Sequence, residues 1–285
     1  MVLLVRFGEL ALKSPFVRRQ LRNRLVENIQ EMFAADRIEC LIRADRARIY
    51  VEVNDVPAAS RALRRVFGIV SFSDAQEASS DPEEIATRAV EIAKGRVTKG
   101  GSFAVRSRRS GTHPYTSQDI ARLVGRRIQE VELGARVDLD DPDVEIHIEV
   151  RENRSYLFTA IGGGPGGLPM GSQGRVLAVV DSEAGAVAAW LSMKRGCKVT
   201  AAAPDGSNAY EPLRRWDVRL KVLPWGPDAE LQDLVRLSRS EAVVLGSRVE
   251  DTTATKSTLD VPVFHPVIGL DEAALTTLAD RIRTA

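Results

Sequence analysis

Residues 161–196, IGGGPGGLPMGSQGRVLAVVDSEAGAVAAWLSMKRG, contain the pattern that decides the fold of this chain. A glycine-rich run leads into the apolar stretch 176–180, a tight turn covers residues 181–185, and a helical pattern then ends at Gly196. A strand, a loop and a helix in this order can present backbone N–H groups and the positive end of the helix to a phosphate. The functions that the chain could have differ in one point, which is whether this loop binds a nucleotide.

The composition is that of a soluble globular protein. With 285 residues, 44% hydrophobic and 28% charged, the chain is long enough for two or three modules. No apolar run approaches the roughly 20 residues that span a bilayer, and the opening segment, with an acid at Glu9, predicts a strand and not a signal peptide. Cys40 and Cys197 lie far apart and outside any CxxC motif, so neither a disulfide framework nor a zinc site is indicated. We expect a cytoplasmic protein with no membrane segment and no metal site.

Residues 1–75 predict an N-terminal ferredoxin-like module. The expected elements are a strand at 2–7, a helix starting at Ser14-Pro15, a hairpin of strands at 38–43 and 48–53, a helix at 56–67 and a strand at 69–73. This module carries the basic excess of the chain, with 13 Lys and Arg against 9 Asp and Glu. Arg18 and Arg22 fall one turn apart on a face of the first helix away from its buried side, with Arg19 and Lys13 nearby.

Residues 76–162 predict a second module whose sheet exposes one face to solvent. In the strand at 102–109, Phe103 and Val105 face one way, and Arg106 and Arg108 face the other. Arg109 ends this strand and adds a third cation. The module carries 13 basic against 15 acidic residues, so charge alone favours an ordinary solvated surface over a nucleic-acid interface.

Residues 163–174 form a glycine-rich linker, read as a hinge, and residues 175–285 predict a Rossmann-like α/β module. Its strands are apolar runs separated by helices, which is typical of a mostly parallel sheet covered on both faces. We expect strands at 175–180, 197–203, 217–223 and 241–246, with helices at 184–195 and 228–238 and a last helix after Asp271.

From the residues alone, the loop at 181–185 is only a candidate nucleotide site. Neither GxGxxG nor GxxxxGK[ST] occurs there, and the glycine cluster precedes the strand, where it cannot cradle a phosphate. The three histidines, His113, His147 and His265, have no spacing that indicates a metal site or a triad. We therefore name no catalytic residue.

Several segments resemble the ThiI family of tRNA 4-thiouridine sulfurtransferases, in the family's order and across the whole chain. They include Val5-Arg6-Phe7-Gly8-Glu9 with Lys13, Phe103-Ala104-Val105-Arg106, Gly166-Gly167-Leu168-Pro169-Met170-Gly171, and Met193-Lys194-Arg195-Gly196. The resemblance implies a ferredoxin-like domain, a THUMP domain and a PP-loop ATP pyrophosphatase domain. It also implies that the first two grip the acceptor-stem end of tRNA, which we assign to Lys13, Arg18, Arg19 and Arg22 with Arg106, Arg108 and Arg109.

The resemblance weakens at the nucleotide loop. The family reads SGGxDS where this chain has Val180, Asp181, Ser182, Glu183, Ala184 and Gly185, and its later GES motif is only partly kept from Gly246. An acid at Asp181 or Glu183 would repel an ATP phosphate by about 1–4 kcal/mol. The stretch between Asp205 and Ser240 is also shorter than in the family, and we expect no rhodanese-like domain.

We therefore predict a tRNA-binding protein with a degenerate PP-loop and no cofactor, acting as a recognition subunit or regulator of tRNA modification. A separate modification enzyme or sulfur carrier would be its partner, and a homodimer is a further expectation. Two alternatives stay open. One is an ATP- and Mg²⁺-dependent tRNA sulfurtransferase that takes sulfur from an external donor, and the other is a scaffold without RNA.

Overall fold

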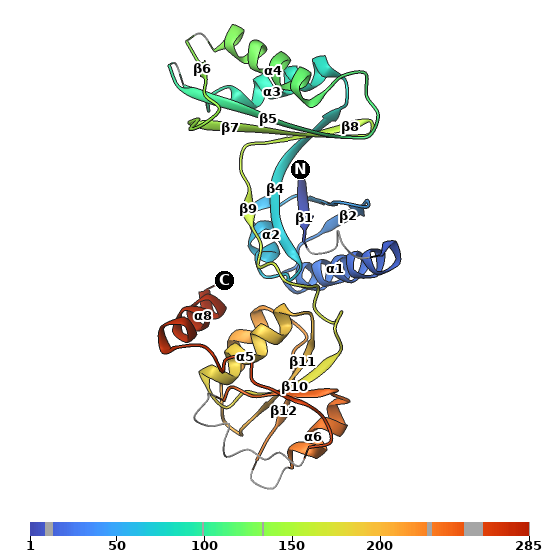
Figure 1. The fold of residues 1–285 in the computed structure, drawn as a ribbon, viewed down its shortest axis with the longest axis vertical. Coiled ribbons are helices and arrows are strands. Elements are labelled where there is room, and N and C mark those ends of the chain that lie inside the picture. The colour runs from blue at the N-terminus through green and yellow to red at the C-terminus, as the bar shows by residue number, and fades with distance from the viewer. Residues whose placement is uncertain (9–13, 99, 133, 227–229, 248–258, 285) are drawn as a thin grey trace.

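The computed structural model describes residues 1–8, 14–98, 100–132, 134–226, 230–247 and 259–284. Figure 1 shows three modules along the long axis of the molecule, with the N-terminal module between the other two. The mixed α+β and α/β fold class predicted from the sequence is confirmed, with the ferredoxin-like, THUMP and parallel-sheet modules in the expected order. Among the described helices, none is both long and apolar enough to cross a membrane.

The first module has the predicted ferredoxin-like element order. Its elements are β1 (Val2–Phe7), α1 (Pro15–Ala35), β2 (Cys40–Ala44), β3 (Ile49–Val53), α2 (Val56–Leu63) and β4 (Ile69–Ser79). The Ser14 hydroxyl caps α1 by accepting a hydrogen bond from the Val17 N–H at 3.3 Å, and Pro15 occupies the first turn. Leu25 and Ile29 are fully buried against the sheet, as the helical spacing predicts.

Strand β4 is longer than predicted and belongs to two modules. Its first half pairs antiparallel with β1, and Gln76 to Ser79 pair with β8 (Arg154–Phe158) of the second module. The expected end at residue 73 and the expected module boundary at 75/76 therefore fall inside one strand. The polar residues near the end of β4 are typical of a loop, but they form a strand because β8 pairs with their backbone N–H and C=O groups. One continuous sheet, with order β2-β3-β1-β4-β8-β7-β5-β6, thus joins the first two modules.

The second module places two helices on one face of this sheet, as Figure 1 shows. Its further elements are α3 (Pro82–Ala93), β5 (Ser102–Ser110), α4 (Ser117–Val131), β6 (Arg136–Val137) and β7 (Val144–Arg151). Thr116 and Asp119 form a capping box at the start of α4. Phe103, Ile146 and Ile148 pack under the helices, so the alternate residues of β5 and β7 face the opposite side.

The third module is the predicted parallel sheet, with strand order β12-β11-β10-β13-β14. Its elements are β10 (Arg175–Val179), α5 (Glu183–Lys194), β11 (Lys198–Ala203), η1 (Glu211–Arg215), β12 (Lys221–Pro224), α6 (Leu231–Ser238), β13 (Ala242–Val244), β14 (Val263–Phe264) and α8 (Glu272–Thr284). The strand expected from residue 217 starts later, because buried Asp217 accepts a hydrogen bond from Lys198 Nζ at 2.7 Å and from the Leu220 N–H at its carbonyl, which holds a turn there.

The glycine-rich linker is tightly packed, so its glycines serve close backbone approach and do not form the expected hinge. The short strand β9 (Gly162–Gly163) pairs with β4. A Cβ on Gly164 would lie 2.3 Å from the Ile69 carbonyl oxygen, and one on Gly167 would lie 2.2 Å from that of Lys194. Only glycine lets the backbone pass at these distances. The linker therefore ties the first module to the third.

Candidate nucleic-acid interface

Two of the predicted cations line a cavity between the first two modules. Arg106 and Arg108 point from the open face of β5 into a cavity of about 670 Å³, and Arg6 of β1 closes its other side. Because β5 alternates, burial of Phe103 under the helices forces these arginines onto the open face. Arg109 does not line the cavity, and its Nη1 donates to the Gly111 carbonyl at 3.0 Å.

The two arginines of this cavity differ in how far their charge is compensated. Arg106 Nε lies 2.8 Å from Glu145 Oε1, and its Nη2 donates to the Leu139 carbonyl at 2.7 Å. Arg108 has no acidic partner within 4 Å among the described residues. Burial lowers the pKa of His147 despite the nearby Glu145 carboxylate, which leaves the ring neutral at pH 7. Arg108 therefore carries the less compensated positive charge of the two.

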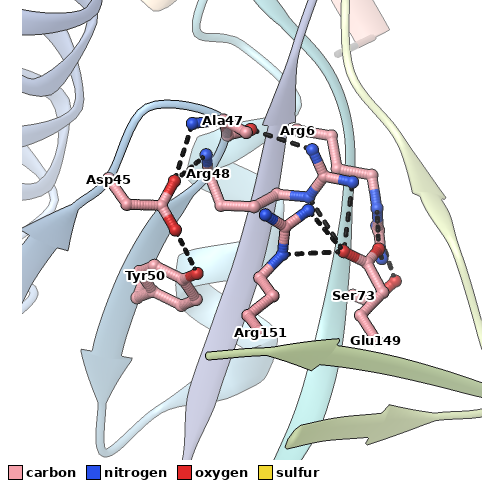
Figure 2. Close-up of polar contacts among 8 residues, drawn as sticks. All are labelled: Arg6, Asp45, Ala47, Arg48, Tyr50, Ser73, Glu149 and Arg151. Atoms are coloured by element: carbon pink, nitrogen blue, oxygen red, sulfur yellow. Dashed lines mark hydrogen bonds and ion pairs between the residues drawn. The ribbon is translucent and has the colours of Figure 1, made fainter. Parts of the chain in front are cut away.

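A buried ion cluster adjoins this cavity, because its members Arg6 and Glu149 also line the cavity, and Figure 2 shows its polar contacts. The Glu149 carboxylate, only 8% exposed, lies 2.9 Å from Arg6, 3.1 Å from Arg48 and 3.2 Å from Arg151. Arg6 also donates to Ser73 Oγ at 3.0 Å and sits over the Phe158 ring. Burial would raise the pKa of Glu149, but the guanidinium groups of Arg48 and Arg6 outweigh it and hold that pKa below its ordinary value.

This cluster, referred to below as the Glu149 cluster, was missed by sequence reasoning. Arg6 and Arg48 come from the first module, while Glu149 and Arg151 come from β7 of the second. The Arg6–Glu149 pair spans 143 positions of the chain. The alternation of β7 places Glu149 on the open face, but no local pattern says which cations meet it.

A second cavity, of about 580 Å³, brings together three other predicted cations at the start of α1. Arg18, Arg19 and Arg22 line it, together with Phe16 and Arg46. Lys13, the fourth predicted cation, lies outside the described residues. Arg22 Nη1 donates to the Asp45 carbonyl at 3.0 Å, which fixes its guanidinium without neutralising it. Phe16 is 59% exposed. Sequence reasoning missed Phe16 and Arg46. Phe16 could have been found from the sequence, because it is an aromatic residue outside the buried face of the helix.

The candidate nucleotide loop is capped by its own side chains. Ser182 Oγ accepts from the Gly185 N–H at 3.2 Å and donates to Asp181 Oδ1 at 2.9 Å. Gly246 packs against this turn so closely that a Cβ there would lie 2.4 Å from the Gly185 nitrogen. Val180 is buried and its N–H donates to the Ala202 carbonyl. These five residues do come together, as predicted, at the start of α5.

A second acid stands at the same helix end and is held from another helix. Glu183 Oε2 accepts from Arg283 Nη1 of α8 at 2.6 Å, which raises the pKa of Arg283 through hydrogen bonds to Glu183 and Asp280. Internal groups thus meet the positive end of α5, where a phosphate would otherwise sit. Within the described part of the chain, no group of three or more His, Cys, Asp or Glu side chains could hold a metal ion.

Comparison with known proteins gives consistent matches across the chain. The family model of the ThiI ferredoxin-like domain matches residues 2–73, and that of the THUMP domain matches residues 79–160. A probable tRNA sulfurtransferase of Methanothermobacter thermautotrophicus is 32% identical over 99% of this chain and 85% of its own length. One of Aeropyrum pernix is 40% identical over 95% of this chain and 80% of its own length.

Two solved structures share the fold. The crystal structure of PH1313 from Pyrococcus horikoshii matches with a TM-score of 0.85 and 30% identity, covering 99% of each chain. A 4-thiouridine synthetase–RNA complex with bound ATP matches with a TM-score of 0.78 and 20% identity, covering 99% of this chain and 84% of the other. The match to the Methanothermobacter protein runs over 338 positions, more than the 285 residues present here, so that relative holds extra residues within the shared span.

Proposed function

Since the chain belongs to the ThiI family of tRNA sulfurtransferases, we propose that it binds tRNA through its first two modules, with residues 1–75 and 76–162 acting as one unit. The observation that carries this proposal is the pair of arginine-lined cavities, one at the start of α1 and one between the modules. Arginine suits this task because its planar fork donates two hydrogen bonds to one phosphate.

The expected mode of recognition is shape and backbone contact, because phosphates dominate affinity and A-form RNA hides its base edges in a deep, narrow groove. The Glu149 cluster supports this mode. It fixes the β7 strand against β1 and the β2–β3 hairpin, so both cavities keep one relative geometry. The relatives named tRNA sulfurtransferase, and the related fold solved with RNA, agree with this proposal.

The test is salt-dependent binding of a tRNA transcript to the variant Arg106→Glu/Arg108→Glu. The variant should bind at least about tenfold more weakly, with the slope of log affinity against log salt reduced by about two. The charge-matched control is Arg175→Glu/Lys221→Glu, because both side chains are exposed on strands of the third module and line neither cavity. Equal binding by the variant and this control would refute the assignment.

We further propose that the third module, residues 175–285, has lost ATP-dependent catalysis and that the protein serves as a recognition subunit or regulator. Support comes from the α5 terminus, where Ser182 caps the helix and Glu183 is held by Arg283. A separate modification enzyme or sulfur carrier would then complete the reaction. Isothermal titration with ATP and Mg²⁺ tests this proposal: no heat of binding is expected at micromolar concentrations, and micromolar affinity would contradict it.

A second candidate function, an ATP-dependent tRNA sulfurtransferase with an external sulfur donor, is favoured by the names of the relatives and by the ATP in one related structure. The discriminating measurement is the 4-thiouridine content of tRNA from a strain that lacks this gene, complemented with wild type or with Asp181→Ala/Glu183→Ala. The enzyme would be favoured if thiolation of tRNA in the strain requires the gene, and if thiolation by the purified protein requires added ATP.

A further inference from the structure

A third basic cavity lies at the other end of α1, where the first module meets the third. It has a volume of about 710 Å³ and is lined by Arg61, Arg64 and Arg65 of the first module and Arg215 of the third. One acid lines it, Asp36, which follows the last residue of α1. None of these residues was predicted as a site residue.

The arginines of this cavity are held in place mostly by neutral groups. Arg64 Nη1 donates to the Gly163 carbonyl at 3.5 Å, and its guanidinium lies over the Phe72 ring, 5.5 Å from the centroid. Arg65 pairs with Asp36 and donates to the Arg215 carbonyl at 3.2 Å. Carbonyl oxygens and an aromatic face orient a guanidinium without cancelling its charge.

Two of the four charges are left available. Arg61 and Arg64 are exposed, and neither has an acidic partner within 4 Å among the described residues. Arg61 lies in the last turn of α2 and Arg64 follows three positions later, so both project from neighbouring positions. Asp36 is already used by Arg65. The cavity therefore presents to solvent at least two cations, Arg61 and Arg64, that have no acidic partner among the described residues.

The position of the cavity indicates which anion it takes. Helix α1 has 21 residues, so the cavity near Phe16 and the cavity near Asp36 are about 30 Å apart along one helix. We propose that this third cavity binds backbone phosphates of the same RNA that contacts the start of α1. The length of α1 then sets the distance between the two phosphate sites. The inference rests on the proposed RNA-binding function and adds a site beyond it.

The experiment compares two RNA probes with the variant Arg61→Glu/Arg64→Glu. With a full tRNA transcript, affinity should fall at least about tenfold and the salt slope should drop by about two, one for each lost phosphate contact. With an RNA hairpin whose stem is much shorter than 30 Å, the variant should bind with the same affinity as wild type. The control is again Arg175→Glu/Lys221→Glu, and Arg61→Gln/Arg64→Gln repeats the test without reversed charge.

The outcomes separate this inference from the function on which it rests. Unchanged tRNA affinity and salt slope in both Arg61/Arg64 variants, with wild type binding normally, would overturn the third site and leave the proposed function standing. If wild type itself showed no salt-sensitive binding to either RNA, both proposals would fall.

Discussion

Phe16 is an exposed aromatic residue whose environment is not explained by folding alone. It exposes 59% of its surface on a helix whose opposite face is fully buried, and its neighbours in the cavity are arginines. An aromatic ring among cations is the arrangement that stacks unpaired bases while the cations hold phosphates. Arg22 and Arg46 approach from the helix and from the β2–β3 turn.

We expect Phe16→Ala to weaken binding of a single-stranded RNA oligonucleotide by about 1–3 kcal/mol, since one stacked base contributes that much. Fluorescence anisotropy with a labelled oligonucleotide measures the effect. Phe16→Trp is the control, because it keeps the stacking face and should bind as wild type does. An equal loss with a blunt duplex would show that Phe16 supports the fold and does not stack on a base.

At the scale of elements, strand β4 and the Glu149 cluster make two modules into one. Strand β4 pairs with β1 in one module and with β8 in the other. The Glu149 carboxylate then meets arginines of both modules. An apolar cluster that includes Leu4, Tyr50 and Tyr156 covers the same junction. Shared backbone pairing, buried charge and apolar packing thus act at one place.

Glu149→Gln should lower the free energy of unfolding by about 3 kcal/mol at pH 7, because it leaves three arginines without their shared carboxylate. The folded pKa of Glu149 is depressed below its ordinary value of 4.5, so its contribution is present above about pH 4.5 and is lost as the pH falls. Urea unfolding at pH 7 and at pH 3 measures this, and the wild-type advantage should shrink at the lower pH.

Glu145→Gln is the matched control for this prediction. It changes the same group on the same strand, but Glu145 is 38% exposed and pairs with Arg106 near the surface, so the cost should stay below about 1 kcal/mol. Equal costs for the two substitutions would mean that the Glu149 cluster contributes no more than a surface ion pair.

At the scale of the whole molecule, Phe67 anchors the first module in the core of the third. It follows α2, yet it is only 2% exposed and packs with Trp190 of α5 and Trp216 after η1. Its ring centroid lies 5.5 Å from that of Trp190 and 5.1 Å from that of Trp216. Arg24 and Asn28 of α1 add hydrogen bonds to the Met170 carbonyl at 2.8 and 3.1 Å.

Phe67→Ala should therefore cost about 3–5 kcal/mol and loosen the third module from the first, because it opens a cavity among aromatic rings. Calorimetry should show one unfolding transition in wild type and two in the variant. Phe67→Leu, which fills more of the space, should cost less and keep a single transition. A single transition at the wild-type temperature for Phe67→Ala would contradict this account of the junction.

Local patterns were sufficient for most of the fold. The cap at Ser14, the alternation around Phe103 and the apolar run at 176–180 depend on residues close in sequence, and each element formed where expected. The loop at Asp181 also showed its missing glycines in the sequence itself. Helical spacing and strand alternation indicated which of the arginines share a face, but only the structure brings Arg18, Arg19 and Arg22 to one cavity and Arg106 with Arg108 to another.

The joints between modules could not be predicted in this way. The boundary at 75/76 lies within β4, the linker glycines serve close approach, and Arg61 and Arg64 face a cavity completed by Arg215. Each of these depends on a partner far along the chain. A period of two or 3.6 residues tells which face of an element is buried, but it does not tell what buries it.

The sequence by itself thus determined the three modules and their order, because propensity, capping and alternation act over a few residues, and the resemblance of several motifs indicated the family. Only the tertiary structure decided that the modules are joined through Glu149, β4 and Phe67, and that α1 has a basic cavity near each end. These features arise from contacts between segments up to 150 positions apart, where the energy of burial and charge pairing depends on the whole fold.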